Sequence, residues 1–134
     1  MPRELEENAV IVDTSLWIEY FRRDSDLSRA VGRLVEEDRA VITGPVLYEV
    51  LQGARSQREA GLMLTSLQGL DYIETTADLW MKAGELSASL RKKGTTLPMS
   101  DLVIATAAIE NGLSVYTLDK HFKQMPGLKL YSQD

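Results

Sequence analysis

The sequence of 134 residues contains no cysteine and a single histidine, His121. The absence of cysteine excludes disulfides, thiolate zinc sites and cysteine nucleophiles. With one histidine, the chain can hold neither a metal site built from several imidazoles nor a nuclease mechanism that uses two histidines as acid and base. No apolar run approaches the length of about 18 residues that a membrane-spanning helix needs, so the sequence predicts no membrane span.

The chain also has few basic residues for its acidic ones. Fifteen lysines and arginines stand against twenty aspartates and glutamates, which gives a formal net charge of −5 and a pI near 4.9. Proteins that bind nucleic acid through bulk charge are basic, so this chain is not expected to bind in that way. The length predicts a single domain over residues 1–134, and the lack of cysteine fits a cytoplasmic location.

Short β-branched runs alternate with longer amphipathic stretches along the chain. This alternation predicts an α/β fold with a mostly parallel sheet that helices cover on both faces. Two helices are expected between the first and second strands, and Asp26 is expected to cap the second of them. Another helix is expected from Asp101 to about Asn111. The predicted strands are Val10–Val12, Ala40–Ile42, Asp71–Glu74, Val115–Leu118 and Leu128–Tyr131.

Two acidic residues fall where such sheets bind ligands. Asp13 and Asp119 each follow a predicted strand directly, and ligands sit beyond the carboxyl ends of parallel strands. Glu49 borders the apolar stripe of the helix that Pro45 opens, where a carboxylate needs a partner. Asp101 begins the helix that returns to the strand ending at Asp119. This simple topology predicts that Asp101 lies at the opposite end of the sheet, unless the preceding connection brings it to the same end.

Each of these acids also has an ordinary structural explanation. Asp13 is a suitable cap for the helix after the first strand, and Ser100 with Asp101 is typical of a cap and a first-turn acid. Asp119 fits a turn, and Glu49 fits a solvated helix face. Residue by residue, the sequence leaves these alternatives open.

Four segments in order nevertheless form a specific pattern. They are residues 10–15 with Asp13, residues 49–55 with Glu49, residues 100–108 with Asp101 and residues 117–122 with Asp119. Together they resemble the motifs of PIN-domain ribonucleases, and most closely those of the VapC-type toxins of toxin–antitoxin pairs. The resemblance runs from Val10 to about Leu130. His121 departs from it, because many relatives carry a further acid at that position.

The resemblance implies a three-layer α/β/α sandwich around a parallel sheet of about five strands, with all four acids at one site. Four carboxylates at one site repel each other unless cations intervene, and oxygen ligands suit Mg²⁺ or Mn²⁺. The implied activity is that of a metal-dependent endoribonuclease, which leaves a 5′-phosphate and a 3′-hydroxyl. The implied partners are the RNA substrate, a cognate antitoxin lying across the active-site groove, and a second copy of the chain.

The resemblance also assigns roles to individual residues. Asp13 and Asp101 are expected to bind the metal directly, and Asp119 directly or through water. Glu49 is expected to belong to the same metal site and to position the attacking water. Hydroxyls that would orient these carboxylates belong to Thr14, Ser15 and Thr117. Arg55 and His121 are candidates for contact with the RNA, although a loop-packing or surface role for His121 stays open.

Two other functions compete with this interpretation. One is an interaction module that keeps the same fold without catalysis. The other is a metal-dependent phosphoryl-transfer domain, and two positions of the sequence disfavour it. A receiver domain needs an aspartate after the third strand, where Glu74 follows Ile73, and a haloacid-dehalogenase-like phosphatase needs one where Ser15 stands.

Overall fold

The computed structural model describes residue 5 and residues 7–132, so the remaining residues of the predicted 1–134 domain lie outside the described part. Five strands form a single sheet in the order β3-β2-β1-β4-β5, and every neighbouring pair is parallel. The strands are β1 (Val10–Val12), β2 (Ala40–Thr43), β3 (Asp71–Ile73), β4 (Ser114–Tyr116) and β5 (Lys129–Leu130). The predicted parallel sheet is therefore confirmed.

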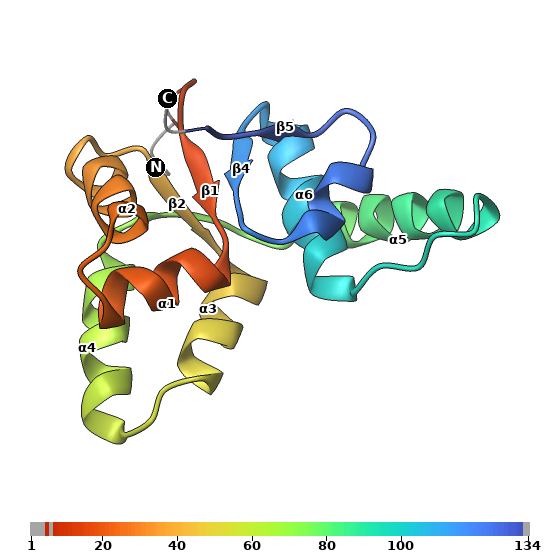
Figure 1. The fold of residues 1–134 in the computed structure, drawn as a ribbon. Helices are drawn as coiled ribbons and strands as arrows, with labels where there is room; N and C mark the ends of the chain where they lie inside the picture. Colours follow the sequence, from red (N-terminus) through yellow and green to blue (C-terminus); the bar gives the residue numbers. More distant parts are fainter. Residues whose placement is uncertain (1–4, 6, 133–134) are drawn as a thin grey trace.

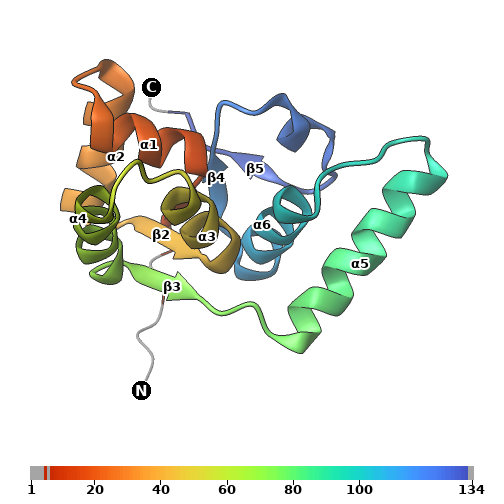
Figure 2. The ribbon, with the colours of Figure 1, turned by 90° about the horizontal axis from the view of Figure 1, so that it is seen from below.

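Helices cover both faces of this sheet. They are α1 (Thr14–Arg22), α2 (Asp26–Glu36), α3 (Gly44–Gln52), α4 (Gln57–Gln68), α5 (Ala77–Lys92) and α6 (Met99–Asn111), with a 3₁₀ helix η1 (Lys120–Gln124) before β5. Helices α1 and α2 lie on one side of the sheet, and α5 and α6 lie on the other (Figures 1 and 2). Helix α3 begins at the carboxyl end of β2 and contacts both α1 and α6. This arrangement is the three-layer α/β/α sandwich.

The middle of the core contains the central strand β1, its neighbour β2 and helix α6. Every residue of β1 and β2 is buried, as expected for β-branched strands covered on both faces. Helix α6 is buried continuously from Asp101 to Ala108, so it is packed on all sides rather than along one stripe. The first turn is buried from Asp101 onward, while Met99 at its start is exposed. No helix in the described ranges is long and apolar enough to span a bilayer.

Two predicted helix starts are wrong. Helix α2 is capped by Ser25 and not by Asp26, because the Ser25 backbone is extended and its hydroxyl accepts from the Ser28 backbone N–H at 3.1 Å. Helix α6 begins at Met99 rather than Asp101, with Pro98 at the capping position. Ser100 is therefore already helical, and its hydroxyl is available for contacts outside the helix.

Candidate functional site

Asp13 follows β1 directly and lies almost completely buried, with 6% of its surface exposed. Because Val12 pairs with Tyr116, the residues after β1 and β4 meet at the same level of the sheet. The Thr117 hydroxyl donates to Asp13 Oδ2 at 2.7 Å, and the Thr14 backbone N–H donates to Oδ1 at 2.8 Å. Asp13 thus caps α1 while its second oxygen faces the loop after β4.

Burial raises the pKa of the Asp13 carboxyl above its ordinary value. The hydrogen bonds from Thr117 and Thr14 oppose this effect, and the nearby charges of Glu49 and Asp119 add to it. The ionised form of Asp13 is therefore disfavoured in the folded protein, although hydroxyl and amide donors hold it.

Asp101 lies at the same end of the sheet as Asp13, so the prediction that the two are separated is wrong. Helix α6 returns the chain to the start of β4 and runs opposite to the strands. A helix in that direction must begin at their carboxyl ends, which is where Asp13 lies. Burial raises the pKa of Asp101, a hydrogen bond from His121 opposes the rise, and the charges of Asp119 and Asp13 increase it.

Asp119 does not follow its strand directly, which corrects a second expectation. Strand β4 ends at Tyr116, and the Asp119 backbone N–H then donates to the Thr117 hydroxyl at 2.9 Å, which turns the chain. Asp119 Oδ1 accepts from the His121 backbone N–H at 2.9 Å and thereby caps η1. The His121 ring lies between two acids, with Nδ1 3.1 Å from Asp101 Oδ2 and 3.2 Å from Asp119 Oδ1.

Glu49 points from α3 toward the same place. Its Oε1 accepts from the Thr14 hydroxyl at 2.9 Å, and its Oε2 lies 3.5 Å from the Ser100 hydroxyl. Ser100 is the residue at this site that sequence reasoning considered only as a helix cap. Its position directly before Asp101 in the third motif was the available signal.

A continuous set of hydrogen bonds and close polar contacts therefore joins the four predicted acids. Thr14 links Asp13 to Glu49, and Thr117 links Asp13 to Asp119. In the described part of the chain, no lysine or arginine forms an ion pair with any of these four acids. One ligand atom each from Asp101, Asp119 and His121 lie within 4.8 Å of one another, a spacing that suits a metal ion.

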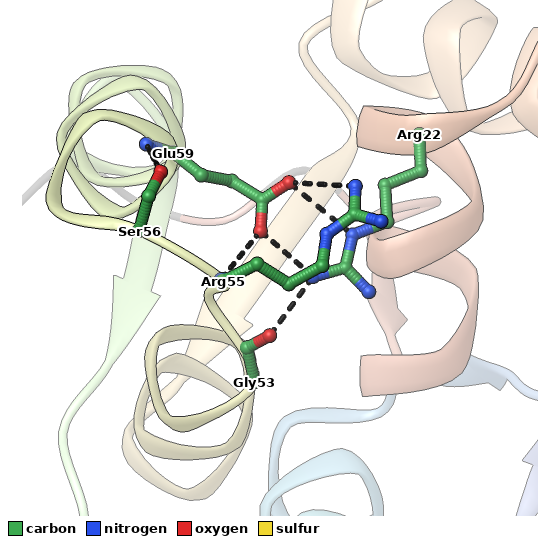
Figure 3. A network of polar contacts seen from close by, with 5 residues as sticks. All are labelled: Arg22, Gly53, Arg55, Ser56 and Glu59. Atoms are coloured by element: carbon green, nitrogen blue, oxygen red, sulfur yellow. Dashed lines mark hydrogen bonds and ion pairs between the residues drawn. The ribbon is translucent and has the colours of Figure 1, made fainter.

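Ser15 and Arg55 lie beside the acids rather than among them. Ser15 is exposed, and among the described residues it makes no hydrogen bond to the four carboxylates. Arg55 is held by Glu59 of α4, which also binds Arg22 of α1 (Figure 3). The Arg22 hydrogen bond, followed by those from Arg55, lowers the pKa of Glu59 to about 2. Ser15 and Arg55 line one surface hollow.

Both the sequence and the structure match known proteins. A family model for the PIN domain matches residues 10–128. Ribonuclease VapC11 of Mycobacterium tuberculosis (strain ATCC 25618 / H37Rv) is 30% identical over 118 residues, covering 84% of this chain and 88% of that protein.

Two solved structures show the same fold. The DNA-bound VapBC structure from Salmonella typhimurium matches with a TM-score of 0.81 and 23% identity, covering 95% of this chain and 99% of the matched chain. A toxin–antitoxin complex from Klebsiella pneumoniae matches with a TM-score of 0.73 and 19% identity, covering 94% and 98%. At these identities the likeness establishes the fold alone.

Proposed function

The chain belongs to the PIN-domain family and, within it, to the VapC ribonucleases, and from this premise we propose that it is an endoribonuclease that acts as the toxin of a toxin–antitoxin pair. The observation that carries the proposal is the meeting of Asp13, Glu49, Asp101 and Asp119 at one edge of the sheet. A non-catalytic module would gain stability by losing buried acids that repel each other. That these acids meet with no lysine or arginine partner among the described residues favours a site that receives a cation.

We propose that this cation is a divalent metal, Mg²⁺ or Mn²⁺, held by Asp13, Asp101 and Asp119. The two His121 distances of 3.1 and 3.2 Å are close to the separation of about 3 Å expected between adjacent ligands of an octahedral ion with bonds of about 2.1 Å. His121 Nδ1 is therefore a candidate ligand as well, and an imidazole suits Mn²⁺ better than Mg²⁺. When bound, the metal lowers the pKa of a water molecule and neutralises charge on the RNA phosphate.

The residues of the chain supply the positioning. The Thr117 and Thr14 donors fix both oxygens of Asp13, so that this carboxylate keeps one orientation. Glu49 is held between the hydroxyls of Thr14 and Ser100. In this proposal it orients the attacking water and accepts its proton. The acidic surface of the protein then matters less for RNA binding, since a bound metal reverses the local field.

We propose two protein partners in addition to the RNA. One is a cognate antitoxin in the cytoplasm, as the toxin–antitoxin complex with the same fold suggests. The other is a second copy of this chain. Exposed apolar side chains of Tyr48, Trp80 and Met99 line a hollow of about 580 Å³ between α3, α5 and α6, and an exposed apolar surface of this kind marks an interface. Glu49 and Ser100 also line this hollow, which would place the second copy beside the site.

The test is cleavage of total cellular RNA by the purified protein with Mg²⁺, with Mn²⁺ or with EDTA. We expect defined fragments from the wild type with a metal and none with EDTA. Asp101→Asn should be inactive. Asp78→Asn is the matched control, because Asp78 is also a first-turn acid but is exposed on α5. Cleavage by Asp101→Asn at the wild-type rate, or no cleavage by the wild type with either metal, would reject the proposal.

A further inference from the structure

A surface hollow lined by three arginines lies next to the acidic site. Its volume is about 590 Å³, and it opens between α1 and the segment that follows α3. The lining residues are Ser15, Ile18, Glu19, Arg22, Arg23 and Arg55. Within the described ranges, none of these arginines forms an ion pair with the four acids, so the hollow is a separate feature of the surface.

We propose that this hollow, the arginine pocket, binds a backbone phosphate of the RNA strand close to the phosphate that is cleaved. The inference rests on the proposed function, because it places the pocket and the acidic site on the same strand. It explains how a chain with a net charge of −5 engages RNA, since the binding charge is concentrated in one place.

The geometry of the arginines supports anion binding. Glu59 accepts from Arg22 Nε and Nη2 at 3.3 and 2.7 Å, and from Arg55 Nη2 at 3.1 Å (Figure 3). One carboxylate thus holds two guanidinium groups side by side, which reduces the entropy cost of a further anion binding to them. The Arg55 side chain is still 69% exposed, so it keeps free donors in the fork arrangement that suits phosphate.

The charges around the pocket leave it positive. Glu59 is shared between Arg22 and Arg55, and Glu19 lies 3.4 Å from the Nε of Arg23. Three guanidinium groups therefore face two carboxylates. The Arg23 side chain is 76% exposed and has donors to spare. A backbone phosphate carries the one negative charge that would balance the three guanidinium groups. Its oxygens also match the free N–H donors of Arg23 and Arg55.

The arginine pocket lies a short distance along α1 from the acidic site. Ser15 lines its near end and stands two residues after Asp13 in the chain, at the start of α1. Arg22 is seven residues further along the same helix, which corresponds to about 10 Å. A strand with its scissile phosphate at the carboxylates therefore reaches the pocket within a few nucleotides.

Glu59 also has a structural role that the test must separate from binding. Its backbone N–H is capped by Ser56, and Arg22 donates to the Gly53 carbonyl at 2.8 Å, so the network ties α1 to α3 and α4. Glu59 is accordingly a positioning residue. Arg23 pairs with Glu19, and in the described part of the chain the side chains bonded to Glu59 are those of Arg22, Arg55 and Ser56, so an Arg23 variant leaves the network intact.

The experiment measures binding of a short fluorescent single-stranded RNA to full-length Asp101→Asn protein over a range of KCl concentrations. Adding Arg55→Ala or Arg23→Ala should weaken binding and reduce the slope of log K against log salt by about 0.7 for each phosphate that the protein no longer neutralises. Arg58→Ala is the control, since Arg58 is an exposed arginine of α4 that does not line the pocket, and it should leave the slope unchanged. Melting curves confirm that each variant is folded.

Equal slopes for Arg55→Ala, Arg23→Ala and Arg58→Ala would overturn the pocket proposal. It would also be overturned if these arginine variants weakened binding of a poly-glutamate peptide but not of the RNA, since the pocket would then serve an acidic protein segment. Total-RNA cleavage by the wild type separates the two proposals. If the wild type cleaves RNA and the slopes are equal, only the pocket fails, whereas absence of cleavage rejects the nuclease function regardless of the slopes.

Discussion

Replacement of Thr117 by valine tests whether the Thr117 hydroxyl stabilises the buried carboxylate of Asp13. The Thr117 hydroxyl donates to Asp13 Oδ2 at 2.7 Å and accepts from the Asp119 backbone N–H at 2.9 Å. Valine has the same shape but makes neither bond. The variant therefore removes a donor from a carboxylate that is already disfavoured by burial, and it releases the turn that brings Asp119 to the site.

The expected loss of stability follows from these two bonds. A hydrogen bond to a charged group contributes about 1.5–3 kcal/mol, and one between neutral groups about 0.5–1.5 kcal/mol. Because Thr117 is only half-buried, water replaces part of both, and we expect a net loss of about 2 kcal/mol. For a chain of this length that lowers Tm by about 7 °C.

The stability that Thr117→Val loses should depend on pH, and the raised pKa of Asp13 fixes the direction of this dependence. The pKa of Asp13 in the folded protein is raised above its ordinary value, so ionisation of Asp13 costs stability as the pH rises through that range. Without the Thr117 donor the folded pKa rises further and the cost grows. The difference between wild type and Thr117→Val should therefore be largest at neutral pH and should shrink in acid, where Asp13 is protonated in both.

Thermal and urea unfolding of the metal-free protein at neutral and acidic pH measure this difference. Thr117→Ser keeps the hydroxyl and should lie close to the wild type. Thr106→Val is the matched control, because among the described residues the Thr106 hydroxyl bonds to the Leu102 carbonyl of its own helix alone. The reasoning is refuted if Thr117→Val costs no more than Thr106→Val at neutral pH, or if its cost is greatest in acid.

Three other predictions concern the metal and the interface. Asp13→Asn removes a buried carboxylate whose pKa is raised, so at neutral pH the metal-free Tm of the variant should equal or exceed that of the wild type. Mn²⁺ should no longer raise the Tm of this variant. A lower metal-free Tm would show that the ionised Asp13 does not cost the folded protein stability. His121→Ala should weaken Mn²⁺ binding about tenfold in calorimetry, and an unchanged affinity would place His121 outside the coordination sphere. Trp80→Glu should convert a dimer to a monomer in light scattering, whereas the same change at the more exposed Leu62 of α4 should not.

Local patterns predicted most of the secondary structure and failed mainly at its boundaries. The β-branched run at β1 and the Gly112 stop of α6 were readable from sequence, since each depends on its own few residues. The cap of α2 was misplaced because Ser25 and Asp26 are both good capping residues, and backbone geometry chose between them. Strand β4 ends earlier than its apolar pattern predicts. The Thr117 hydroxyl accepts a hydrogen bond from the Asp119 backbone N–H, and this bond turns the chain.

The sequence by itself determined which chemical groups the protein has: four acids in four separate motifs, one histidine, no cysteine, and too few basic residues to bind RNA by bulk charge. Only the tertiary structure decided which of these groups meet. The parallel order of β1 and β4 and the reversed direction of α6 bring Asp101 beside Asp13, and η1 turns the His121 ring between Asp101 and Asp119. The physical reason is that a motif records only local spacing, whereas a charged site depends on distances across strands and helices that are far apart in the chain.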